Sequence, residues 1–197
     1  MNFLSKLWLS AATLFEPVQY LFNGNFWNVF AKKFGTFKNV KLIDLACGTG
    51  EINRYIKPKK YLGVDFNKFY ISFALKKFGK SNIEFIISDI ANFKATNRYD
   101  TALLISAAHH LNDKQIVKVC RNLKQNKVKN FLIIDALPQG WLSKALEWLD
   151  ANLGGGEYFR SLSDMEKLVS KEYRIKRKGL FPADKSFYLY YYLEVIL

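Results

Sequence analysis

Residues 42–50 read LIDLACGTG, an apolar run followed at once by a turn that contains two glycines. The run is typical of a buried strand, which we place at residues 40–46. Gly48 and Gly50 let the backbone turn tightly, and the turn leads into a helix that we expect to start near Glu51. On its own, the turn fits either a ligand site or an ordinary tight connection.

Short apolar runs continue to alternate with amphipathic stretches after this first strand, which is the pattern of a parallel sheet covered by helices. The further runs are residues 60–65, 83–88, 101–106 and 131–136. Asn67 is placed to cap a helix that stops near Gly79. A second helix opens at Asn112 or Asp113 and runs to about Lys124.

Two strand-like runs close the chain, at residues 173–178 and 187–196. We expect a turn containing Gly179 and Pro182 to join them, and so short a link makes the two strands antiparallel. Residues 163–166 have the pattern of a capping box that opens one more helix. These elements predict an α/β fold: a three-layer sandwich with a mostly parallel seven-strand sheet whose last strand is antiparallel.

The composition favours one domain with a core of its own, because half of the 197 residues are hydrophobic. A formal charge of +13 indicates nucleic acid, anionic lipid, an acidic carrier protein or a phosphorylated small molecule as partner, or only a biased composition. Cys47 and Cys120 have no metal-ligand spacing and cannot form a disulfide framework. We therefore expect a cytoplasmic protein without a metal, at most peripheral to the inner face of a membrane.

Residues 1–37 are expected to form a helical lid. Apolar residues recur at intervals of three and four from Leu4 to Val18, and Pro17 ends or kinks this helix. No apolar run approaches the roughly 20 residues that cross a bilayer, so we expect neither a signal peptide nor an anchor. The same stripe fits packing against the main domain.

Polar and aromatic residues follow the strands at the edge where an open parallel sheet binds ligands. Asp65 ends the second strand, where its carboxylate can accept hydrogen bonds from both hydroxyls of a ribose. Phe66 can lie against an adenine ring, and Asp89, after the third strand, can accept from an exocyclic amino group. These positions predict a ligand that carries a nucleoside.

Five stretches resemble, in order and spacing, the class I Rossmann-like S-adenosylmethionine-dependent methyltransferases. They are LIDLACGTG (42–50), YLGVDFN (61–67), SDI (88–90), YDTALLISAAHHLND (99–113) and FLIIDALP (131–138). The resemblance implies the fold of that family, S-adenosyl-L-methionine as cofactor and no metal. Members with paired histidines after the fourth strand are similar to methyltransferases that act on quinones, lipids and natural products.

The resemblance also implies a cofactor site. Asp44 and the turn at residues 46–50 would hold the methionine end, and Ile90 would join Phe66 against the adenine. Ala46 stands where the family often has glycine. The implied cofactor-binding residues are Asp44, Ala46, Cys47, Gly48, Thr49, Gly50, Asp65, Phe66, Asp89, Ile90 and Ser106.

His109 and His110 are the only histidines of the chain, and they follow the predicted fourth strand. If the methyl acceptor must lose a proton, an imidazole here can take it as a general base. We therefore predict a catalytic role for at least one of the two and favour His109. The alternative is a structural role, in which the ring satisfies a backbone carbonyl or caps the next helix.

Related enzyme types fit less well. A nicotinamide enzyme would have a third glycine where this chain has Asn53. A base-amino methyltransferase would have two prolines at Ala107 and Ala108. A metal-assisted catechol methyltransferase would have Asp-Asn after the fifth strand, where Asp135 and Ala136 stand.

The sequence therefore predicts a single methyltransferase domain over residues 1–197, acting on a small-molecule or lipid-like acceptor. Residues 38–136 would bind the cofactor, residues 137–171 would face the acceptor, and residues 172–197 would supply the closing strands. The alternative is a non-catalytic protein of the same fold that holds RNA or an anionic membrane. Because the basic residues are scattered, we expect no specific nucleic-acid binding and only weak contact with an anionic membrane or an acidic carrier protein.

Overall fold

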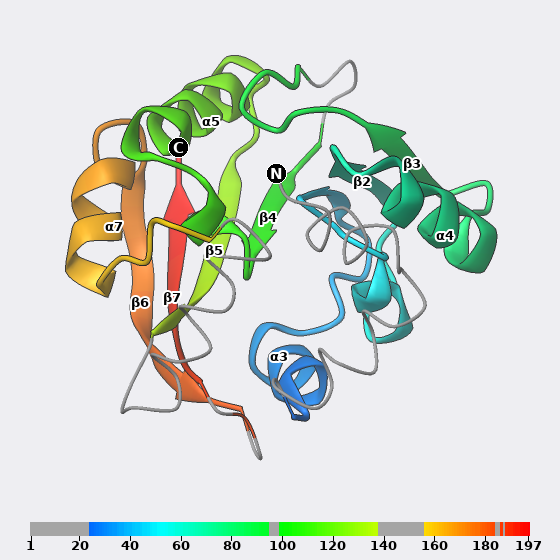
Figure 1. Ribbon diagram of the computed structural model, residues 1–197, viewed down its shortest axis with the longest axis horizontal. Helices are drawn as coiled ribbons and strands as arrows, with labels where there is room; N and C mark the ends of the chain where they lie inside the picture. Colours follow the sequence, from blue (N-terminus) through cyan, green and yellow to red (C-terminus); the bar gives the residue numbers. More distant parts are fainter. Residues whose placement is uncertain (1–23, 95–98, 138–155, 184–185, 187) are drawn as a thin grey trace.

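The computed structural model describes residues 24–94, 99–137, 156–183, 186 and 188–197 (Figure 1). Its strands are β1 (Lys41–Leu45), β2 (Lys60–Asp65), β3 (Ile83–Ile87), β4 (Thr101–Ile105), β5 (Asn130–Leu137), β6 (Arg174–Pro182) and β7 (Leu189–Ile196). Its helices are α3 (Phe26–Phe34), α4 (Lys68–Phe78), α5 (Asp113–Gln125) and α7 (Leu162–Val169), with the short 3₁₀ helices η1 (Glu51–Arg54) and η2 (Ala108–His110).

The strands form a seven-stranded sheet in the order β3-β2-β1-β4-β5-β7-β6. Strands β1 to β5 pair in parallel, whereas β7 is antiparallel to both of its neighbours, β5 and β6. The predicted α/β class and the reversed last strand are confirmed. The strand order changes direction between β1 and β4, and a ligand crevice forms at such a point in open sheets.

Helices cover both faces of the sheet, which gives the three predicted layers (Figure 1). Side chains of α5 and α7 pack in one buried cluster with Ile43 and Leu45 of β1. Side chains of α3 and α4 pack in the other cluster with Leu42 of the same strand. The alternation along β1 therefore supplies apolar contacts to both layers.

Two of the predicted helix starts are confirmed, because each has a side-chain cap. The side chain of Asn67 accepts hydrogen bonds from the backbone N–H groups of Phe69 and Tyr70 at the start of α4. Asn112 and Gln115 form a reciprocal capping box at the start of α5. Such caps satisfy N–H groups that have no partner within the helix.

The predicted start of the last helix is wrong by two residues. The cap is Ser161, whose hydroxyl accepts a hydrogen bond from the Asp164 N–H group, and not Ser163. Both serines stand three residues before an acidic residue, so the local pattern does not separate them. The preceding residue, Arg160, is bonded to η2 and α5, and this tertiary contact holds the chain extended up to Ser161.

The predicted turn between the closing strands is also wrong. Gly179 and Pro182 both lie inside β6, which is longer than expected and pairs Pro182 with Leu189. In the described part of the sheet β6 is the outermost strand, where a proline's missing N–H group leaves no ladder bond unmade. Likewise, the helix expected at Glu51 begins there but is only the four-residue η1.

Part of the predicted amino-terminal lid is a core helix. Phe26 and Phe30 of α3 are buried, and the Phe26 ring lies 5.8 Å from Phe181 and 4.6 Å from Tyr190. Residues 1–23 of that segment lie outside the described residues. So do residues 138–155, which belong to the predicted acceptor-side segment at residues 137–171. None of the described helices is long and apolar enough to cross a membrane.

The close packing at Gly63 of β2 provides a test of the fold. A Cβ atom at this position would lie 2.5 Å from the Phe85 ring and 2.8 Å from the Cys47 sulfur. We expect Gly63→Ala to lower the free energy of unfolding by about 1–3 kcal/mol, the usual cost of overpacking. Urea denaturation would measure it. Adding Phe85→Leu should recover part of the loss, and equal stability of Gly63→Ala and the parent would contradict this packing.

Candidate active site

Two strained turns lie side by side at the carboxyl ends of β1 and β4. Ala46 and Ser106, the first residues after these neighbouring strands, have left-handed φ angles of 57° and 51°. Side chains with a Cβ atom rarely adopt this conformation, and such strain gathers at functional sites. Gly48 and Gly50 are also left-handed, so the turn after β1 needs its glycines.

Asp65 ties this glycine turn to the end of β2. Its Oδ2 accepts a hydrogen bond from the Gly48 N–H group at 2.9 Å, and its Oδ1 accepts one from the Asn67 N–H group at 2.8 Å. Burial of the carboxyl, which is 6% exposed, raises its pKa, and the backbone hydrogen bonds oppose that rise. A carboxylate has about four lone-pair sites, so about two remain to accept hydroxyl hydrogen bonds.

A second buried acidic residue, Asp44, lies in β1 just before the glycine turn. It is 4% exposed, and the Tyr61 hydroxyl donates a hydrogen bond to its Oδ2 at 2.7 Å. Burial raises the pKa of Asp44 to about 7; the Tyr61 hydrogen bond acts against this rise and the charge of Asp65 adds to it. Asp44 therefore lies inside the protein as an acid that is protonated over a wide pH range.

The other predicted cofactor residues differ in how exposed they are to solvent. Phe66 is 69% exposed beside Asp65, and Asp89 is exposed at the end of β3, where its Oδ1 accepts a hydrogen bond from the Ala91 N–H group. Ile90, in contrast, is buried in the core cluster on the α5 face. Thr49 is buried and Cys47 partly so, and burial raises the pKa of the Cys47 thiol. The structure thus leaves Phe66 and Asp89 exposed beyond the ends of β2 and β3, whereas Ile90 belongs to the core.

His109 forms a buried pair with an aspartate that the sequence patterns did not single out. Its Nδ1 lies 2.7 Å from Oδ1 of Asp135 in β5, and both side chains are buried. Because a carboxylate only accepts, Nδ1 donates in this bond, and a neutral imidazole in this tautomer carries its lone pair on Nε2. His110 is exposed, and its ring centre lies 4.2 Å from that of His109. His109 and Asp135 are 26 positions apart, so no local pattern predicts their pairing.

Residues 157–159 hold His109 from the other side. The Glu157 and Tyr158 N–H groups both donate to the His109 carbonyl, at 3.1 and 2.8 Å. The Phe159 ring stacks on the imidazole with ring centres 4.6 Å apart and planes 6° apart. The imidazole is thereby fixed in orientation by Phe159 and Asp135.

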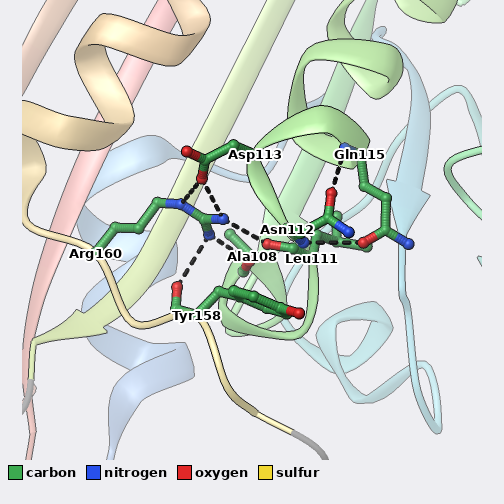
Figure 2. A network of polar contacts seen from close by, with 7 residues as sticks. All are labelled: Ala108, Leu111, Asn112, Asp113, Gln115, Tyr158 and Arg160. Carbon is green, nitrogen blue, oxygen red and sulfur yellow. Dashed lines mark hydrogen bonds and ion pairs between the residues drawn. The ribbon is translucent and has the colours of Figure 1, made fainter.

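Arg160 fastens this segment to the His109 turn, as Figure 2 shows. Its guanidinium donates to the carbonyls of Ala108 and Leu111, on both sides of the histidines, and to that of Tyr158. It also pairs with Asp113 at 2.8 Å. Four acceptors on one fork-shaped cation make a rigid joint.

The family follows from the sequence match. A family model described as a methyltransferase domain matches residues 36–177, well over half of the chain. The chain belongs to this family. Together with the seven-strand topology, the match confirms the predicted class I Rossmann-like methyltransferase.

Solved structures share this methyltransferase fold at low sequence identity. An S-adenosylmethionine-dependent methyltransferase from Mesorhizobium loti has a TM-score of 0.68 at 13% identity, covering 87% of this chain and 97% of its own. Magnesium protoporphyrin IX methyltransferase from Synechocystis has a TM-score of 0.62 at 16% identity, and the match covers 100% of this chain and 87% of that chain. Human N-acetylserotonin methyltransferase has a TM-score of 0.60 at 17% identity, and the match covers 79% of this chain and 46% of that chain. No curated protein sequence matches the chain.

Asp44 leads to a prediction about the pH dependence of stability. Because its pKa rises from 3.8 to about 7 on folding, the folded chain binds more protons than the unfolded chain between these values. Stability should therefore fall as pH rises from about 4 to 7, by at most about 1.4 kcal/mol per pH unit from this group. Asp44→Asn removes the titrating group, so its urea-unfolding free energy should fall less across this range. Equal slopes for parent and variant would contradict the assignment.

Proposed function

We propose that this protein transfers a methyl group from S-adenosyl-L-methionine to a small-molecule or lipid-like acceptor. One observation carries the proposal: the Gly48 turn tied to Asp65 and the His109–Asp135 pair lie at the same carboxyl edge of the sheet. The first arrangement suits a nucleoside, and the second suits removal of a proton from an acceptor. The family match supports the reaction class.

The residues present fit the cofactor. When bound, S-adenosyl-L-methionine supplies a methyl group activated by a positively charged sulfur. The remaining lone pairs of Asp65 accept from the ribose hydroxyls, Phe66 offers an exposed ring to the adenine, and Asp89 offers a carboxylate to its amino group. Two of the structural neighbours were solved with this cofactor or its demethylated product bound, which supports the assignment.

His109 acts as the general base in this proposal. Where the acceptor group must lose a proton on methylation, Nε2 of His109 would accept that proton. Asp135 holds the Nδ1 proton, keeps the ring in the tautomer with a basic Nε2, and stabilises the imidazolium that forms. The chain thus supplies alignment, a proton acceptor and shielding from water.

The acceptor class rests on the neighbours and on the surroundings of His109. Two neighbours are named for small-molecule acceptors, magnesium protoporphyrin IX and N-acetylserotonin. The stacked Phe159 is an apolar, aromatic surface beside the proposed base, as expected for an aromatic or lipid-like acceptor. Residues 137–171 would then form the acceptor side of a single domain with a cytoplasmic location, and the lid would be restricted to the part of residues 1–37 that precedes α3.

Asp65 tests the cofactor site. Asp65→Ala removes two acceptors from the ribose and releases the Gly48 turn, so binding of S-adenosylhomocysteine should weaken by a few kcal/mol, at about 1.5–3 kcal/mol for each bond to a charged group. Calorimetric titration would measure the affinity. As a control, Glu84→Ala removes a carboxylate at the exposed edge of β3 and should bind like the parent. A variant at Asp65 that binds as tightly as the parent would refute the site.

His109 and Asp135 test the chemistry. His109→Gln and Asp135→Asn should each lower kcat by about 10²–10⁴-fold, because the proton acceptor or its orientation is lost. His110→Gln is the matched control and should keep most of the rate. Release of S-adenosylhomocysteine with a panel of hydroxylated aromatic and lipid acceptors measures turnover, and calorimetry checks that cofactor affinity is kept. A larger loss in His110→Gln than in His109→Gln would reassign the base.

A further inference from the structure

A hollow lies at the edge of the sheet opposite the proposed methyl-transfer site. It is about 740 Å³ in volume and lies beside the amino ends of β1, β2 and β3, whereas Gly48 and Asp65 follow the carboxyl ends. Its lining residues are Thr36, Lys38, Asn39, Lys57, Pro58, Lys59 and Asn82. Ligand sites of small molecules have volumes of about 300–1,000 Å³, so this hollow is of a suitable size.

The hollow is strongly positive. Three of its seven lining residues are lysines and none is acidic. The carboxylates nearby are already engaged, since Glu84 pairs with Lys60 at 3.1 Å and Asp100 accepts from the Lys41 N–H group. Within the described residues, the ammonium groups of the three lining lysines form no ion pair. Three lysines that have no ion-pair partner among the described residues and line one concave site attract a compact anion of high charge.

The backbone around the hollow is fixed before any ligand binds. Lys38 and Pro58 form an antiparallel bridge, and the Lys57 N–H group donates to the Thr36 carbonyl at 2.8 Å. The Asn82 side chain donates to the Pro58 carbonyl at 3.3 Å. These bonds join the segments before β1, β2 and β3, so a ligand would meet preorganised walls.

A strained turn places the first of the lysines. Phe37 and Asn39, on either side of Lys38, have left-handed φ angles of 56° and 67°. The Phe37 ring stacks on Phe30 of α3, with ring centres 5.9 Å apart, and anchors the turn to the core. Lys38 is therefore held at the hollow by a turn whose conformation costs free energy.

We propose that this hollow binds a small phosphorylated ligand, with a diphosphate or similar group held by Lys38, Lys57 and Lys59. Ammonium groups bind phosphate as point charges, and the side chains of Thr36 and Asn39 offer uncharged donors beside them. A nucleic acid needs a basic track that follows its backbone, whereas this site is a single hollow of cofactor size. The site is distinct from the methyl-transfer site and does not rest on its assignment.

Titration of the full-length protein with pyrophosphate at near-physiological salt tests the proposal. We expect saturable binding by calorimetry, with amide shifts in NMR at Thr36 and Asn82 and none at Gly48. Lys57→Gln with Lys59→Gln should weaken binding about tenfold or more, as expected from loss of one or more charge-assisted contacts. Lys171→Gln with Lys176→Gln is the matched control, because these exposed lysines lie elsewhere and the net charge changes equally.

Three outcomes would overturn the proposal. The first is pyrophosphate binding that both double variants weaken equally, since only the overall charge would then matter. The second is a set of amide shifts centred on Gly48, which would move the anion to the other edge. The third is single-stranded RNA that binds more tightly than pyrophosphate and loses its affinity in the Lys57 and Lys59 variant, which would make a polymer the ligand. A thermal melt of each variant checks that it is folded.

Discussion

The carboxylate of Asp65 accepts hydrogen bonds from two backbone segments that arise from different strands, and the rest of the site depends on this arrangement. The bond from Gly48 fixes the turn after β1, and the bond from Asn67 fixes the entry to α4. Since the carboxylate is nearly buried, breaking either bond would remove one of the backbone donors that stabilise its charge in a region of low polarity. Asp65 therefore shapes the nucleoside end of the site as well as offering its remaining lone pairs to a ligand.

The other end of the site is shaped by a contact between distant segments. Arg160 joins the chain before α7 to the turn that carries His109, and Phe159 completes the wall against the imidazole. An arginine with four acceptors loses little freedom for each bond it makes, so the joint is stiff. In the proposed reaction, this stiffness matters because a general base must be held within hydrogen-bond reach of the proton it removes.

The wrong predictions from the sequence have a common physical cause. Ser161 and Ser163 have equivalent local patterns, and the residue before Ser161, Arg160, makes long-range bonds that no local pattern contains. Gly179 and Pro182 are turn residues by composition, yet they continue β6 because they pair with Tyr192 and Leu189 of β7. The outer side of β6 in the described sheet has no neighbouring strand, so the proline breaks no ladder bond there. Local propensity is a weak preference of about 1 kcal/mol or less per residue, which tertiary contacts readily exceed.

The sequence by itself determined the α/β class, the five parallel strands with their approximate bounds, the cap at Asn67, a helix start at Asn112 or Asp113, and the position of Asp65 at a strand end. The strands and caps follow from patterns within about ten residues of chain, the range at which periodicity and capping act. The α/β class follows from the order in which those local elements alternate along the chain. The tertiary structure alone decided which carboxylate meets His109, where Arg160 is anchored, and that Lys38, before β1, lines one hollow with Lys57 and Lys59, before β2. Such contacts join residues about 20 to 50 positions apart, and their geometry is set by how the strands are ordered in the sheet rather than by any local sequence signal.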